Sequence, residues 1–173
     1  METLNNTLRT ATTAMLYAHR KLCTHAVTLT LKQAAWIETA KGRSYTRLTP
    51  LIAQKTLRHT LNRLNRCFWG NAARRKPNTH KLLVIASLEG QRSHKRLHYH
   101  LQIGNLPKHL TQTDLRDAIT LAWTANDFGD TQINIQALYG SGWTTYITKE
   151  IGSKDTDCID WENTHFVECG CAD

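Results

Sequence analysis

The stretch from residue 97 to residue 104, LHYHLQIG, constrains the fold of this chain more than any other segment. Polar and apolar residues alternate along it, which predicts a β-strand because successive side chains of a strand point to opposite faces. One face is apolar and suits a core, whereas the other carries His98 and His100. Two imidazoles two residues apart on one side of a strand can reach the same metal ion. We therefore predict a strand with its back in the core and a metal at its front.

A third metal ligand is predicted at Glu89, which ends the apolar run 81–89. The link that follows, residues 90–96, begins with glycine and is polar and basic, as is typical of a hairpin loop. If the two strands pair antiparallel around this loop, Glu89 lies near His98 on the same face. Two histidines and a carboxylate suit Mg²⁺ or Mn²⁺ and leave coordination positions open for a substrate oxygen. The alternative is a pair of unrelated histidines on a solvated strand, and Glu89 in register favours the metal site.

The length of 173 residues suits a single domain, with a core at about 23–152 and an acidic, cysteine-containing tail at 153–173. No apolar run approaches membrane-spanning length and no signal-peptide pattern begins the chain, so we expect a cytoplasmic protein without a membrane partner. Five cysteines form no disulfide framework. The net charge of +8 indicates a polyanion partner, for which nucleic acid is the usual choice.

Apolar spacing and capping signals predict the order of the secondary structure. The predicted elements are a helix at 3–22, a strand at 23–32, a helix from Thr49-Pro50 to Gly70, strands at 81–89 and 97–104, a helix starting at 111–114 and a strand at 131–138. Without the first helix, this is the βαββαβ order of a ferredoxin-like antiparallel sheet, an α+β fold. Its helices would pack on one face and the metal site would occupy the other. The segment 33–47 is left unassigned.

A candidate nucleophile follows the last predicted strand. Residues 143–151, WTTYITKEI, predict a short helix on which Tyr146 and Lys149 share a face. A free phenol has a pKa of about 10 and is a poor nucleophile at neutral pH. A neighbouring ammonium and a divalent cation would stabilise the phenolate and the charge that develops on a phosphate. The pattern thus suggests attack of the phenol oxygen on phosphorus, with an ordinary amphipathic helix as the alternative.

These motifs together resemble the HUH endonucleases, in particular the single-tyrosine rolling-circle replication initiators (Rep proteins). The strand 25–31 is similar to the first motif of that family, His98-Tyr99-His100 to its His-hydrophobe-His motif, and Tyr146-x-x-Lys149 to its tyrosine motif. The resemblance covers residues 23–152, and the combination in this order is more specific than any part. The tyrosine follows the histidines, as in Rep proteins and single-strand transposases and unlike relaxases.

The resemblance implies a Mg²⁺- or Mn²⁺-dependent nickase and strand transferase that cuts single-stranded DNA at an origin, often beside a hairpin. Tyr146 would become linked to the 5′ phosphate and leave a 3′ hydroxyl that primes synthesis. Such proteins serve the DNA replication of a plasmid or phage. No Gly-rich phosphate-binding loop appears in the chain, so either a host helicase and polymerase are the expected partners or the chain is the nuclease part of a longer protein. Only Tyr139 could act as a second tyrosine.

Basic residues of two predicted loops would bind DNA phosphates, and Gln102 would add a contact to DNA or metal. These residues are Arg92, Lys95 and Arg96 in the hairpin and Arg74, Arg75 and Lys76 in the loop 71–80. One alternative is a single-strand transposase of the same superfamily. Another is a non-catalytic nucleic-acid-binding module that stacks bases on its sheet, which the lack of aromatic residues on the polar face disfavours. In the tail, a frayed or strand-forming segment is favoured over a zinc clip from Cys158, His165, Cys169 and Cys171.

Overall fold

The computed structural model describes residues 2–91, 95–139, 142–149, 151 and 158–166. Its helices and strands, in chain order, are α1 (Glu2–Arg20), β1 (Cys23–Leu31), β2 (Ala34–Thr39), β3 (Gly42–Arg47), α2 (Pro50–Trp69), α3 (Ala72–Arg75), β4 (Leu83–Glu89), β5 (His98–Gly104), α4 (Gln112–Thr124), β6 (Gly129–Ala137) and α5 (Gly142–Ile147).

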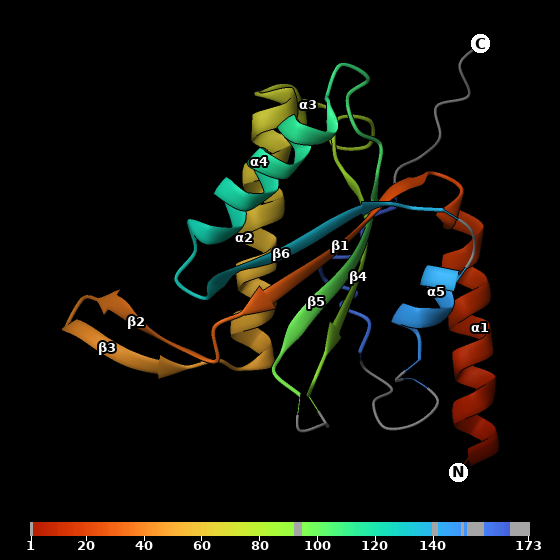
Figure 1. The fold of residues 1–173 in the computed structure, drawn as a ribbon, viewed down its shortest axis with the longest axis horizontal. Coiled ribbons are helices and arrows are strands. Elements are labelled where there is room, and N and C mark those ends of the chain that lie inside the picture. Colours follow the sequence, from red (N-terminus) through yellow and green to blue (C-terminus); the bar gives the residue numbers. More distant parts are fainter. Residues whose placement is uncertain (1, 92–94, 140–141, 150, 152–157, 167–173) are drawn as a thin grey trace.

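Four strands form one antiparallel sheet in the order β4-β5-β1-β6, and β2 and β3 form a separate hairpin that extends away from it (Figure 1). The protein is therefore an α+β fold, as predicted. The hairpin accounts for the segment that the sequence left unassigned, and its turn is Ala40-Lys41, between the paired residues Thr39 and Gly42.

The first core lies between the sheet and the helices α2 and α4. Alternation along β1 and β5 turns one apolar row of each strand toward these helices, whose own apolar stripes complete the core. Thr49 caps α2 with proline at its first position, and Thr111 and Asp114 form a capping box at α4. Both predicted helix starts are confirmed.

A second core covers part of the opposite face, which we had expected to be free of helices. Leu16 of α1, Ile147 of α5 and Ile151 pack there against Leu83 and Ile85 of β4. Figure 1 shows α5 between the sheet and α1. The physical reason is that Leu83 and Ile85 interrupt the polar face with apolar side chains, and covering them removes that apolar surface from water. The expectation of helices on one face alone is therefore wrong.

Part of the acidic tail lines the outer edge of β4. Ile159 and His165 form isolated bridges with Ser87 and Val84, so this edge is partly paired by the chain itself. The buried hydroxyl of Tyr99 donates a hydrogen bond to Asp160 at 2.8 Å and ties the tail to the first core. The other cysteines of the suggested zinc clip, at 169 and 171, lie outside the described residues. Within the described part of the chain, no helix is long and apolar enough to cross a membrane.

Candidate metal centre

The hairpin between β4 and β5 brings the three predicted ligands together. Gly90 follows Glu89 directly and has φ +100°, a left-handed conformation that a side chain would strain. A Cβ atom there would also lie 2.8 Å from the carbonyl oxygen of Arg96. In the antiparallel register of β4 and β5, Glu89 lies opposite His98. The predicted pairing of these two residues on one face is confirmed.

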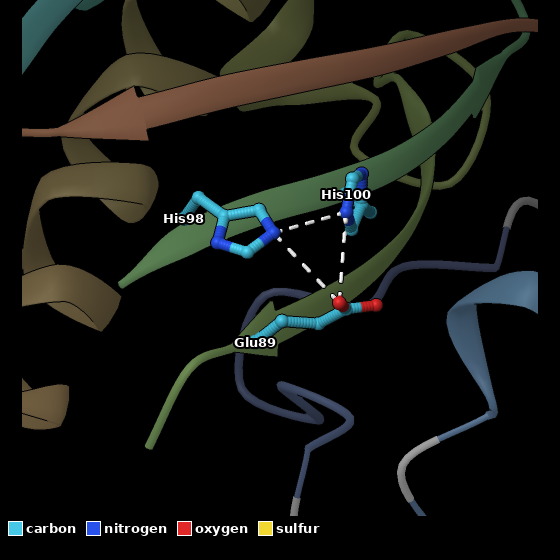
Figure 2. Close-up of side chains that lie close together, drawn as sticks. All are labelled: Glu89, His98 and His100. Carbon is cyan, nitrogen blue, oxygen red and sulfur yellow. Dashed lines mark hydrogen bonds and ion pairs between the residues drawn. The ribbon is translucent and has the colours of Figure 1, made fainter. Parts of the chain in front are cut away.

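The ligand atoms of Glu89, His98 and His100 all lie within 4.8 Å of one another (Figure 2). The two histidine Nε2 atoms are 3.1 Å apart, and each is 3.7 Å from Oε2 of Glu89. Glu89 is fully buried and His100 nearly so, whereas the His98 side chain keeps 19% of its exposure. The cluster therefore opens to solvent on the side of His98.

These separations fit one small divalent ion. Two donors each about 2.1 Å from an ion lie about 3.0 Å apart at a right angle and about 3.6 Å apart at 120°. The observed 3.1 and 3.7 Å fall at these values. In addition, the buried Oε1 of Glu89 accepts no hydrogen bond from any described residue. An acceptor left alone in a buried site is costly unless a cation satisfies it.

The outer nitrogens of both imidazoles are held by neighbouring groups. Nδ1 of His98 lies 2.8 Å from the carbonyl oxygen of Arg96 and must donate to it, which leaves the lone pair of a neutral ring on Nε2. Nδ1 of His100 lies 3.0 Å from the hydroxyl of Thr28 on β1, which can donate or accept. Such outer hydrogen bonds orient the histidines that bind metals in proteins.

His100 is neutral at physiological pH. Burial, together with the proximity of His98 and of the ammonium groups of Lys149 and Lys95, lowers its pKa from 6.5 to about 3. A neutral imidazole keeps the lone pair that a metal requires.

The predicted nucleophile lies beside this cluster. The ring of Tyr146 meets the His100 ring edge-on at 5.0 Å between centroids and stacks on Trp143 at 5.1 Å. The ammonium of Lys149 lies 3.4 Å from the centroid of the Tyr146 ring and 2.9 Å from Oε2 of Glu89. Tyr146 itself is 41% exposed, so a substrate can approach it. The Glu89–His98–His100 cluster, the phenol and the ammonium thus form one continuous site.

Lys149 keeps its positive charge in this position. Its partial burial lowers the pKa of the ammonium, but the contacts with Tyr146 and Glu89 outweigh that effect, and the net pKa is raised. Lys149 lies in the turn that follows α5, because the helix ends at Ile147 and is shorter than predicted. Its ion pair with Glu89 was not anticipated from the sequence.

The predicted basic DNA-binding residues that the structure describes lie in two separate places. Lys95 and Arg96 are exposed beside a cavity of about 300 Å³ that His98 also lines. Arg92 lies outside the described residues. The three basic residues of the other loop, Arg74, Arg75 and Lys76, are exposed around α3. They lie at the end of the sheet opposite to the β4–β5 hairpin (Figure 1).

Gln102 is fully buried, in contrast to the expected contact with DNA. Its Nε2 donates a hydrogen bond to the hydroxyl of Thr144 at 3.0 Å, so it joins β5 to α5. The alternation of β5 does place Gln102 on the face of the two histidines, but α5 covers that position.

Two further site residues were missed by sequence reasoning, Trp143 and Thr28. Trp143 lies three residues before Tyr146, a helical spacing that could have indicated the stacking. Thr28 belongs to the polar row of β1 and pairs with His100 in the sheet register.

Comparison of the chain with family models, with curated proteins and with solved structures gives no match.

Proposed function

We propose that this protein is a metal-dependent endonuclease that nicks and rejoins single-stranded DNA through one tyrosine, as the resemblance to HUH Rep proteins implies. One observation carries the proposal: the cluster of Glu89, His98 and His100 lies in direct contact with Tyr146 and Lys149. The βαββαβ succession, once the hairpin and α1, α3 and α5 are set aside, supports the ferredoxin-like assignment.

The residues of the chain have separable roles in such a reaction. The phenol oxygen of Tyr146 attacks the phosphorus of a backbone phosphodiester, one P–O bond forms, and the bond to the 3′ oxygen breaks. The phenol gives its proton to solvent water, and the leaving 3′ oxygen takes up a proton from solvent to become a hydroxyl. Lys149 stabilises the phenolate through its charge. A Mg²⁺ or Mn²⁺ ion held by the cluster would supply Lewis-acid polarisation of a phosphate oxygen.

The covalent 5′-phosphotyrosine preserves the number of phosphoester bonds, so the step is reversible and permits strand joining. This property fits the initiation of rolling-circle replication in the cytoplasm of the host of a plasmid or phage, where a helicase would unwind the duplex and a polymerase would extend the free 3′ end. A single-strand transposase would use the same chemistry on transposon ends.

A base-stacking module without catalysis is less consistent with the structure. Such a module needs an open sheet face with aromatic side chains on its central strands. Here α5 and α1 cover the part of that face over β4. On the same face, the central strands β1 and β5 carry Thr28, His98 and His100 in place of aromatic side chains for stacking.

The test is formation of a covalent adduct. Incubation with random and hairpin-bearing single-stranded oligonucleotides plus Mn²⁺ should give a protein band shifted by one attached strand. Tyr146→Phe should abolish the adduct, because the attacking oxygen is lost while the ring remains. Tyr139→Phe is the matched control and should leave the adduct in place, since Tyr139 is 87% exposed and absent from the contacts of the cluster.

An adduct that persists in Tyr146→Phe would overturn the assignment of the nucleophile. Complete absence of nicking with either oligonucleotide set and Mn²⁺ would overturn the proposed activity. Preference for a hairpin followed by an origin-like single strand, rather than for paired transposon ends, separates the initiator from the transposase.

A further inference from the structure

The β2–β3 hairpin, residues 34–47, has two unlike faces, and we call it the β2–β3 arm. Its inner face carries Ala35 and Ile37, which pack against the edge of the first core. Its outer face carries Trp36, paired in register with Tyr45, and both rings are more than half exposed. Contiguous exposed apolar surface that is rimmed by polar residues is typical of interaction sites. We therefore infer that the outer face is a binding surface.

The charge on the outer face indicates the chemistry of its ligand. Arg43 and Arg47 occupy the same face, on either side of Tyr45 along β3. Arg43 lies 5.7 Å from the centroid of the Trp36 ring and 3.6 Å from Glu38. The arm holds three basic residues against this one acidic residue. Aromatic rings interleaved with arginines suit a strand of unpaired bases joined by phosphates.

The base of the arm is fixed next to the metal cluster. The side chain of Gln33 donates to the carbonyl oxygens of Leu31 and Leu97 and accepts a hydrogen bond from the backbone of Leu97. Leu97 immediately precedes His98 on the chain. The backbone of Leu48 closes the other side by donating to Gln33 at 2.9 Å. The arm therefore leaves the sheet at the end where the cluster opens to solvent.

A cavity lies beside the cluster, and Leu97, which is hydrogen-bonded to Gln33 at the base of the arm, is among its lining residues. It has a volume of about 300 Å³, and the end of β1, the basic residues Lys95 and Arg96, and His98 line it. A strand lying across Trp36 and Tyr45 would meet these basic residues on its way to the cluster. Asp130 also lines the cavity, so the cavity is not uniformly positive.

We propose that the β2–β3 arm binds single-stranded DNA, with unpaired bases stacked on Trp36 and Tyr45 and phosphates bound by Arg43 and Arg47. The choice of DNA as the strand rests on the proposed function. The arm would hold the strand outside the metal cluster and direct it there. It is a binding element and takes no part in the chemistry.

The test measures equilibrium binding of a labelled 20-nucleotide oligo(dT) by fluorescence anisotropy. EDTA is present so that no cleavage occurs. Trp36→Ala should weaken binding by roughly 5- to 150-fold, the effect of one lost stacked base, and the double variant with Tyr45→Ala should weaken it further. Trp36→Phe should retain most of the affinity. Trp161→Ala is the matched control, because Trp161 is half exposed on the tail, and it should bind as the wild type does.

The double variant Arg43→Gln/Arg47→Gln should lower the slope of log Kd against log salt concentration by about 1.4, because each phosphate contact to a single strand contributes about 0.7 to that slope. Wild-type affinity of the folded Trp36→Ala/Tyr45→Ala double variant for oligo(dT) would overturn the proposal. So would an equal loss of affinity for duplex DNA, which offers no unpaired bases to stack. Because no nicking is measured, the arm can pass this test even if no covalent adduct forms, and the two proposals fail separately.

Discussion

Replacing Glu89 by glutamine separates its role as a metal ligand from its role in the fold. The substitution keeps the shape of the side chain and removes its charge. Without metal, Lys149 loses its partner at 2.9 Å, but the buried position no longer has to hold a carboxylate. Breaking a buried ion pair costs about 3–5 kcal/mol when the remaining charge stays buried. Because the Lys149 side chain is 29% exposed and reaches water, we expect a loss of only about 1 kcal/mol.

The effect on metal binding should be much larger. At a Mn²⁺ concentration 100 times the dissociation constant, binding raises the free energy of unfolding by about 2.7 kcal/mol. For a chain of 173 residues this corresponds to a rise in Tm of about 5–10 °C. Glu89 supplies the only negative charge of the cluster. Loss of a residue that merely hydrogen-bonds a metal ligand weakens metal affinity by about 10- to 100-fold. Loss of the ligand Glu89 should therefore weaken Mn²⁺ affinity by at least about 100-fold. At the same Mn²⁺ concentration the gain is then at most about 0.4 kcal/mol, or about 1 °C.

The assay is thermal unfolding with and without Mn²⁺, after treatment with EDTA. Glu38→Gln is the matched control, because it makes the same change at a carboxylate that is 81% exposed on the β2–β3 arm, and it should keep the wild-type shift in Tm. A full Mn²⁺-induced shift in Glu89→Gln would refute the reasoning that this carboxylate binds the ion.

Two further predictions concern the tail. Tyr99→Phe should lower the free energy of unfolding by about 1.5–3 kcal/mol in urea titrations, because the buried carboxylate of Asp160 loses a donor at 2.8 Å; an unchanged urea midpoint would contradict this. Burial, with the charges of Lys81 and Arg58, lowers the pKa of His165 from 6.5 to about 4. The unfolded chain therefore binds a proton at His165 more readily than the folded chain does. The contribution of the neutral ring to the free energy of unfolding is fully present above pH 6.5 and is lost as the pH falls toward 4. The ring is only partly buried, so solvent screening limits the loss to about 1 kcal/mol. His165→Gln should remove that part of the pH dependence in urea titrations between pH 7 and pH 4.5, and a pH-independent difference from the wild type would contradict this.

The ligand set of the metal centre could be predicted from the sequence because it depends on local geometry. Alternation along residues 97–104 places His98 and His100 on one face, and a glycine-initiated loop returns the chain so that Glu89 meets them. The caps at Thr49 and Thr111 are local in the same sense, since each bonds within its own first turn. Strand period and helix caps are set by neighbours a few residues apart, and the pairing of Glu89 with His98 joins two consecutive strands across the short loop 90–97.

The contacts that complete the site join residues distant in sequence and arise only in the folded chain. Lys149 reaches Glu89 across sixty residues, and the short helix α5 must cross the sheet for this ion pair to form. The same placement of α5 buries Gln102, although its position on β5 is equivalent to those of the two histidines. The alternation of a strand specifies which face a side chain occupies. Whether that face meets water or another element depends on the packing of apolar surface from the whole chain.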